Sequence, residues 1–189
     1  MQTAANVDSG KLTYRDFLKF PDDGQRHELI DGVHCVTPSP FVPHQMVLGN
    51  LYFHLRLYLD VHPTGRLFLS PSDVVLSTCD IVVPDLFFVS EARRHIVQEA
   101  NVQGAPDLVV EIRSRSTARR DEGVKLALYD RSGVGEYWVV DPRAEVVRVY
   151  RRGMRDLACV AELASDTDAC LTSPLLRGFS LPIGQVFAR

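Results

Sequence analysis

The chain has 189 residues, of which 46% are hydrophobic and 24% charged, so we expect one globular domain over residues 1–189 and exclude an intrinsically disordered chain. Its net charge of −3 argues against a surface devoted wholly to nucleic acid but allows a local basic patch. Because the apolar runs are strand-sized and no secretory signal is recognisable, we expect a cytoplasmic protein without a membrane span.

The N-terminal third is expected to contain a short helix, a hairpin and a long helix. Thr13 can cap a helix over residues 14–19. The pair Asp31-Gly32 separates two apolar runs, which predicts a two-residue β-hairpin. After Pro43, a long helix with one face on the core is predicted by apolar residues three and four positions apart: Val47, Leu48, Leu51, Leu55 and Leu59.

Strands and one further helix are expected in the rest of the chain. Strands are predicted at residues 66–69, 73–76, 86–89 and 107–113. A helix should follow from Thr117 to about Arg131, ended by Gly133 and Gly135. The last expected elements are a strand at 136–140, a hairpin of 146–150 and 157–161, and a tail after Leu175 that forms a loop with a short terminal helix.

This order of elements predicts an α/β fold of mixed α+β type. A central mixed β-sheet should be flanked by helices, with hairpins from the N-terminal and C-terminal parts of the chain at sheet edges.

Glu111 is unusual because it lies within the apolar strand 107–113. Burying a charged group costs free energy unless the group is paired or bound to a metal ion. Side chains alternate along a strand, so Glu111 and Arg113 share a face, and a plain ion pair between them is one explanation. A metal ligand is the other.

Asp85 repeats this pattern within the apolar run 81–89. Pro84 cannot donate a hydrogen bond to a β-ladder, which indicates an edge or a bulge that re-aims the following side chain. A turn aspartate would explain Asp85 if it stood alone. With Glu111 on a neighbouring strand, it makes a pair of oxygen ligands suited to Mg²⁺ or Mn²⁺.

Cationic residues follow Glu111. Lys125 either pairs with Asp121, four residues earlier on the expected helix, or orients an attacking water and neutralises a reacting phosphate. The segment 113–120 holds four arginines and no acid. Cations oppose the dipole at a helix start, so a bound anion would explain them, and a solvated charged loop is the alternative.

Other chemistry has less support in the sequence. The chain has no Gly-x-Ser-x-Gly elbow, no glycine-rich phosphate loop and no HExxH pair among its six histidines. His44 is expected to be a polar residue at the start of the long helix, and Glu28 a plain strand residue. The four cysteines lie far apart without a CxxC pair, which predicts reduced or scattered core residues rather than a zinc site.

One set of segments is specific in combination: Leu12–Tyr14, Glu28–Gly32, Pro84–Asp85, Pro106–Ile112, Ser116–Thr117, Lys125–Tyr129 and Glu136–Asp141. In this combination the chain resembles the Uma-two family of restriction endonucleases, which belongs to the PD-(D/E)XK nuclease superfamily. The string from Pro106 to Asp141 carries most of the resemblance.

The resemblance implies a central mixed sheet with helices on both faces, and it implies roles by position. Asp85 resembles the aspartate of the PD element, and Glu111 resembles the acid of the (D/E)XK element. Arg113 stands where that pattern has its lysine, so the resemblance assigns the role of the lysine to Lys125. Arg115 stands where relatives typically carry proline, and both departures leave room for altered or lost activity.

The resulting hypothesis is metal-assisted hydrolysis of a nucleic-acid phosphodiester, with DNA as the expected polymer. Asp85, Glu111 and the backbone carbonyl of Ile112 would hold Mg²⁺ or Mn²⁺, and Glu28 is the candidate extra acid by analogy. Lys125 would position the attacking water or stabilise the charge of the transition state. Flanking phosphates are assigned to Arg113, Arg115 and Arg119.

Two alternatives stay open. The fold could persist without catalysis, as a module that binds nucleic acid or a protein partner. Alternatively, Glu111–Arg113 and Asp121–Lys125 could be plain ion pairs with a structural role only. A homodimer is expected in the leading hypothesis, because a twofold assembly suits the cleavage of two strands.

Overall fold

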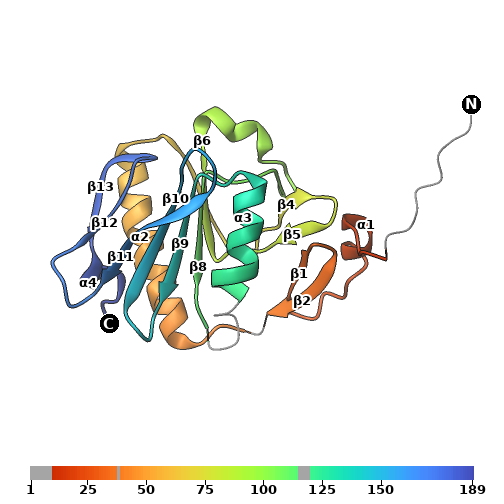
Figure 1. Ribbon diagram of the computed structural model, residues 1–189, viewed down its shortest axis with the longest axis horizontal. Helices are drawn as coiled ribbons and strands as arrows, with labels where there is room; N and C mark the ends of the chain where they lie inside the picture. The colour runs from red at the N-terminus through yellow and green to blue at the C-terminus, as the bar shows by residue number, and fades with distance from the viewer. Residues whose placement is uncertain (1–9, 38, 115–119) are drawn as a thin grey trace, which may run out of the picture.

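A six-stranded mixed β-sheet forms the centre of the molecule, with the strand order β11-β10-β9-β8-β6-β3 (Figure 1). In a computed structural model, residues 10–37, 39–114 and 120–189 are described. The strands of the central sheet are β3 (Gly65–Leu69), β6 (Leu86–Ser90), β8 (Leu108–Ile112), β9 (Glu136–Asp141), β10 (Val146–Arg152) and β11 (Leu157–Ala164). Strands β8 and β9 run parallel and the other neighbours run antiparallel, which confirms the predicted mixed sheet.

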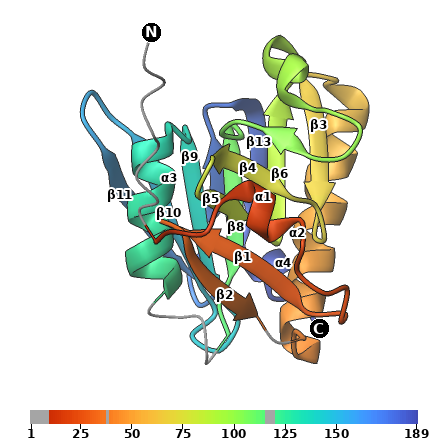
Figure 2. The same cartoon turned by 90° about the vertical axis from the view of Figure 1, so that its right-hand side faces the viewer.

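Helices α2 (Val42–Val61) and α3 (Leu126–Ser132) cover opposite faces of this sheet (Figure 2). Because side chains alternate along β8, Val110 packs on the α2 side, whereas Val109 packs on the α3 side. The apolar stripe predicted for the long helix is confirmed, since these five residues are buried: Val47, Leu48, Leu51, Leu55 and Leu59.

A second sheet lies beside the central one and has the strand order β2-β1-β5-β4-β7. Its strands are β1 (Arg26–Ile30), β2 (Val33–Thr37), β4 (Val74–Ser77), β5 (Asp80–Val82) and β7 (Val102–Gln103). A 3₁₀ helix, η1 (Glu91–Ile96), follows β6. The sequence pattern does not predict β5, β7 or η1 as separate elements, because they are short.

The predicted hairpin at Asp31-Gly32 is confirmed and lies at the edge of this second sheet. The φ angles of Asp31 and Gly32 are 53° and 72°, the left-handed values that a tight two-residue hairpin requires. A Cβ at residue 32 would lie 2.5 Å from the Cβ of Lys11, so this turn position also requires glycine because there is no space for a side chain. The preceding helix α1 (Tyr14–Phe17) is shorter than expected, and its Asp16 carboxylate accepts hydrogen bonds from the N–H and hydroxyl of Thr13.

The C-terminal tail corrects the sequence prediction. Instead of a loop from Leu175, the chain forms a hairpin of β12 (Cys170–Ser173) and β13 (Leu176–Pro182), followed by the expected terminal helix, α4 (Ile183–Val186). The reason is apolar burial on the α2 side of the sheet, to which four residues of the hairpin contribute: Leu171, Leu176, Phe179 and Leu181.

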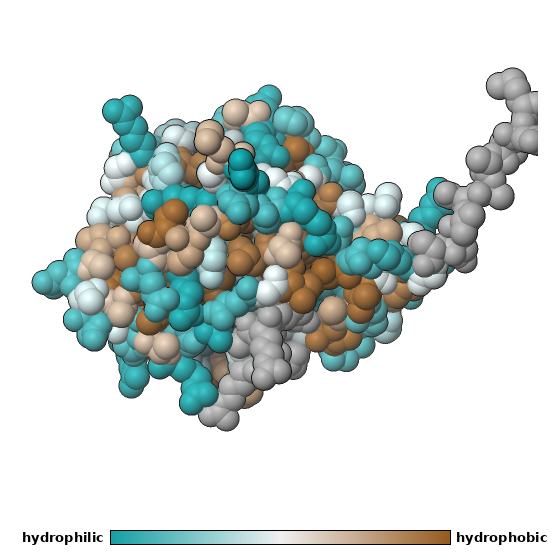
Figure 3. All heavy atoms as spheres, in the orientation of Figure 1, coloured by the Kyte–Doolittle hydropathy of each residue, from teal (hydrophilic) through white to brown (hydrophobic). Residues whose placement is uncertain are grey.

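The cysteine prediction also needs correction. The four cysteines are free, as expected, but none lies in the core, since Cys35 and Cys79 are half-buried and Cys159 and Cys170 are exposed. In the described ranges, no helix is long and apolar enough to cross a membrane. Hydrophilic and hydrophobic side chains are intermixed over the face that carries α3 (Figure 3).

Candidate functional site

Three buried acids gather where β6 begins and β8 ends. Glu28, Asp85 and Glu111 expose 1%, 2% and 4% of their surface. Leu86 of β6 pairs with Val110 of β8, so continuing this antiparallel register sets Asp85 opposite Glu111. Glu28 reaches the same region from β1, where its Oε1 accepts a hydrogen bond of 3.0 Å from the N–H of Val83. The fold therefore brings together carboxylates that are far apart in sequence.

Lys125 joins two of these acids. Its Nζ lies 2.8 Å from Oε1 of Glu111 and 2.9 Å from Oε1 of Glu28, and the side chain is 3% exposed. It is the last residue of a π-helix, η2 (Arg120–Lys125), that continues into α3. The expected helix is thus present over its described part, and Gly133 ends it with the left-handed φ of 86°. Wide π turns are rare and often mark functional sites.

Tyr129, one turn after Lys125, holds the same glutamate. Its hydroxyl donates a hydrogen bond of 2.7 Å to Oε1 of Glu111. Burial, followed by the charge of Glu111, raises the pKa of the Tyr129 phenol well above its usual value. The phenol therefore stays protonated and acts as a donor that fixes the orientation of the Glu111 carboxylate.

Asp85 is held by the side chains of Arg26 and His44 and by one backbone amide. Its Oδ1 accepts from Nη1 of Arg26 at 2.6 Å, and its Oδ2 accepts from the N–H of Ile112 at 2.8 Å and lies 3.1 Å from Nε2 of His44. Burial has the largest single effect and raises the pKa of Asp85. The hydrogen bond and charge of His44, the charge of Arg26 and the Ile112 amide outweigh it together and lower this pKa to about 2. Asp85 is therefore ionised at neutral pH.

Sequence reasoning missed three of these partners: Arg26, His44 and Tyr129. His44 was expected to be a polar residue at a helix start, but it is 5% exposed. His44 precedes Val47 by three residues and Leu48 by four, so it lies on the buried stripe of α2. This spacing was a signal in the sequence that His44 is buried. Its Nδ1 is buried and meets no hydrogen-bond partner among the described residues. No local pattern pointed to Arg26.

The predicted arginine cluster is only partly described. Nη1 of Arg113 lies 2.8 Å from Oδ2 of Asp141 and 3.1 Å from Oε1 of Glu122, so the alternative in which Arg113 pairs with Glu111 is wrong. Outside the described residues lie Arg115, Ser116, Thr117, Arg119 and the side chain of Asp121, and their predicted roles stay predictions.

Two cavities meet at His44 on either side of the start of α2. One, of about 450 Å³, is lined by Arg26, His44 and Asp85. The other, of about 690 Å³, is lined by His44 and by residues at the ends of β8 and β9, among them Arg113. Asp85 thus lines a groove, whereas Lys125, Glu111 and Glu28 are buried.

The family model Uma2, described as "Putative restriction endonuclease", matches residues 14–184 of the chain. This chain belongs to the Uma2 family. The predicted resemblance is therefore confirmed over most of the sequence. None of the curated proteins compared with the Uma2 chain gave a match.

One solved structure that is similar to this Uma2 chain is the crystal structure, at 1.96 Å resolution, of a "putative nuclease belonging to DUF820" from Anabaena variabilis ATCC 29413. The two chains share 21% sequence identity, the match covers 94% of this chain and 98% of the other, and the TM-score is 0.78. At this identity the likeness establishes the fold, and it confirms the predicted sheet flanked by helices.

The donor chemistry of the Uma2 chain fits a hard divalent cation, because carboxylate oxygens are the ligands that Mg²⁺ and Mn²⁺ prefer. In the part of the chain that the structure describes, however, no three His, Cys, Asp or Glu side chains form a ready metal-binding group. Lys125 is bound to Glu111, and Arg26 and His44 are bound to Asp85. A cation at Asp85 and Glu111 would therefore share or replace contacts that these side chains now make.

Proposed function

We propose that the protein is a metal-dependent nuclease that hydrolyses phosphodiester bonds in nucleic acid, with DNA as the expected polymer. One observation carries the proposal: three buried carboxylates and a buried lysine gather at one place where Asp85 lines a groove, in a chain of the family described as "Putative restriction endonuclease". A buried acid cluster of this kind is costly for stability, and such costs are typical of functional sites.

Asp85 and Glu111 are the proposed protein ligands of Mg²⁺ or Mn²⁺, with Glu28 as the extra acid nearby. The carbonyl of Ile112 is the proposed third ligand, because the N–H and carbonyl of one strand residue point to the same side and Asp85 accepts the N–H of Ile112. When bound, the ion polarises a phosphate oxygen and lowers the pKa of a bound water.

The side chains of the protein have separate tasks in this proposal. Tyr129 fixes the carboxylate of Glu111 by hydrogen bonding, which orients a ligand atom before substrate arrives. The ammonium of Lys125 brings a positive charge next to Glu111, where it stabilises negative charge that develops on the reacting phosphate. Arg113 is proposed as a contact for a flanking phosphate.

A second candidate, a catalytically inactive module of the same fold, has one observation in its favour. Asp85 already makes three contacts, with Arg26, His44 and the amide of Ile112, so its charge is compensated without a metal ion. In that case the protein would bind nucleic acid or a protein partner without cutting it.

The deciding experiment combines cleavage with metal binding. Purified protein is incubated with supercoiled plasmid or single-stranded DNA and Mg²⁺ or Mn²⁺, alongside Asp85→Asn and Glu111→Gln. Saturable Mn²⁺ binding and metal-dependent cleavage that both variants lose would support the proposal. Cleavage by the two variants at the wild-type rate would refute the assignment of the residues. Saturable DNA binding without Mn²⁺ binding would favour the inactive module.

We further propose that two copies of the chain pair through α2. Large apolar side chains are exposed along one face of this helix at Val42, Met46, Phe53, Leu57 and Val61. Their spacing of four and seven residues is that of a helix-packing stripe, and a Cβ added at Gly49 would meet nothing within 4 Å. Contiguous exposed apolar surface marks interaction sites, and a twofold axis would bury the stripe against its own copy.

A further inference from the structure

The larger of the two cavities lies between the start of α2 and the ends of β8 and β9. It has a volume of about 690 Å³, within the usual range for small-ligand sites, and its wall includes Phe41, His44, Arg113 and Arg143. His44 also lines the cavity that contains Asp85. The larger cavity is therefore the immediate neighbour of the proposed catalytic acids.

Phe41 has no role in the fold that would explain an aromatic side chain. It is the N-cap residue of α2, where Ser, Thr, Asp or Asn is preferred, and it makes no capping hydrogen bond through its side chain. Its exposed fraction is 69%, so it is not a core residue. An exposed aromatic ring beside basic groups is the combination with which proteins stack an unpaired nucleobase.

The charge around the cavity favours an anion. Arg113 is paired with Asp141 and Glu122, whereas Arg143 makes no ion pair among the residues that the structure describes. The first turn of the 20-residue helix α2 contains no acid, and its free N–H groups, those of Val42 and His44 since Pro43 has none, carry partial positive charge. Apart from charge, His44, buried in that turn and lining the cavity, has an Nδ1 without a partner in the described residues, so this ring nitrogen is available to a ligand.

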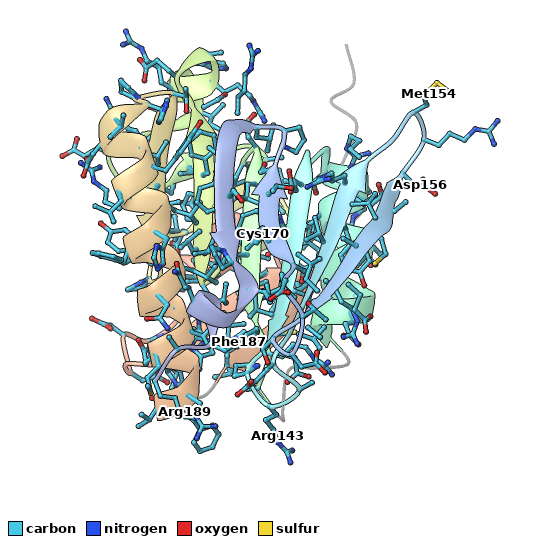
Figure 4. The ribbon with its side chains drawn as sticks, turned by 90° about the vertical axis from the view of Figure 1, so that its left-hand side faces the viewer. Arg143, Met154, Asp156, Cys170, Phe187 and Arg189 are labelled. Carbon is cyan, nitrogen blue, oxygen red and sulfur yellow. The ribbon has the colours of Figure 1, made fainter. Side chains whose placement is uncertain are left out.

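The place of Arg143 agrees with this interpretation. Arg143 projects at the end of the molecule where β9 terminates, whereas Met154 and Asp156, at the tip of the β10–β11 hairpin, lie at the opposite end (Figure 4). An arginine of that hairpin, Arg155, is therefore a matched control: it is exposed and far from the cavity.

We propose that this cavity binds an unpaired nucleotide next to the bond that is cut, with its base stacked on Phe41 and its phosphate held by Arg143 and the start of α2. The proposal rests on the proposed nuclease function for the position of that bond. It names a substrate class, single-stranded or locally unpaired nucleic acid, because a base within a duplex has both faces already stacked.

The test measures binding without cleavage. In EDTA, a fluorescein-labelled single-stranded 12-mer and its duplex are titrated with wild-type protein and the variants Phe41→Ala, Phe41→Leu, Phe41→Trp, Arg143→Ala and Arg155→Ala. A second 12-mer carries 2-aminopurine, whose fluorescence falls when the base stacks on an aromatic ring. Circular dichroism checks that each variant is folded.

We expect the wild type to bind the single strand more tightly than the duplex and to quench 2-aminopurine. Phe41→Ala should weaken binding about 5- to 150-fold, the range for the loss of one base–aromatic stack. Phe41→Leu should behave like Phe41→Ala, and Phe41→Trp like the wild type. Arg143→Ala should lower the slope of log affinity against log salt by about 0.7, the value for one phosphate on a single strand, while Arg155→Ala leaves it unchanged.

Three outcomes would overturn the subsite. The first is a wild-type protein that binds the single strand and the duplex equally tightly, or binds neither. The others are a Phe41→Leu variant that quenches 2-aminopurine as strongly as the wild type, and an Arg143→Ala variant whose salt slope equals that of the wild type. Because no metal is present, these outcomes are independent of cleavage. A protein that binds and stacks the single strand but never cuts it would refute the proposed function and leave the subsite standing.

Discussion

Replacing Lys125 with methionine tests how the acid cluster is held together. Methionine has a similar length and no charge, so Lys125→Met removes the cation that lies 2.8 Å from Glu111 and 2.9 Å from Glu28 and leaves its volume filled. Removing one partner of a buried ion pair costs about 3–5 kcal/mol, because the remaining charge stays desolvated. This is a large share of the roughly 5–15 kcal/mol by which a native domain is stable.

The assay is urea unfolding in EDTA followed by tryptophan fluorescence, since Trp138 is the single tryptophan and is fully buried. With a slope of about 2–3 kcal/mol/M, the loss corresponds to a midpoint lower by roughly 1–2.5 M. Lys19→Met is the matched control: Lys19 pairs with Asp16 on the surface, and its loss should leave the midpoint unchanged.

The same variant tests the metal proposal. Without the ammonium, Glu28 and Glu111 repel each other, so Mn²⁺ should stabilise Lys125→Met more than the wild type. A concentration 100 times the dissociation constant would add about 2.7 kcal/mol. The double variant Lys125→Met/Glu111→Gln should lose this gain. A Lys125→Met protein as stable as the wild type would show that the ammonium does not hold the acids, and an equal effect of Mn²⁺ on all variants would refute the assigned site.

Three further predictions follow from other parts of the structure. The lowered pKa of Asp85, about 2 against an ordinary 3.8, stabilises the fold by about 2 kcal/mol above pH 4, and this contribution is lost as the pH falls toward 2. Between pH 6 and pH 2.5 in EDTA, the unfolding midpoint of Asp85→Asn should therefore decline less steeply than that of the wild type. An equal decline of both proteins would contradict the assignment. Gly133→Ala should destabilise the fold by about 1 kcal/mol or more, since the φ of 86° disfavours alanine although its Cβ would meet no atom within 4 Å. Thermal unfolding checks this against the control Gly184→Ala, because the φ of Gly184 is not left-handed. If two copies pair through α2, Leu57→Glu should be a monomer by light scattering and Arg56→Glu should stay a dimer, whereas a wild-type monomer would refute the pairing.

The sequence predicted the elements whose signals are local. The Asp31-Gly32 turn needs only two residues of special conformation, and the stripe of α2 needs only its own spacing. The C-terminal hairpin was missed because β12 has only four residues and its pairing with β13 is interrupted by a bulge at Thr172 and Ser173. A broken pattern of this length is hard to distinguish from a loop.

In the candidate site, too, the residues with local signals could be predicted and those that depend on long-range contacts could not. Asp85 and Glu111 are anomalous within their own apolar segments, so composition alone marks them. Arg26 sits in an ordinary strand, and its contact with Asp85 spans 59 positions, which no local spacing encodes. Glu28 was expected to be a plain strand residue on local grounds, and only the family resemblance connected it with the acids. Long-range contacts of this kind become visible only in the folded chain.

The contact between Glu28 and Lys125 joins residues 97 positions apart and so closes one of the longest loops in the molecule. Closing a loop of this length costs conformational entropy, which the contact itself must offset. The N-terminal hairpin must dock beside the central sheet before Glu28 can contact Lys125, so a partly folded chain would lack this third acid of the cluster. A spectroscopic label that senses the contact between Glu28 and Lys125 would thus report the docking of the N-terminal hairpin, and a chain that is cut before β1 docks would lack Glu28 and Arg26 at the site.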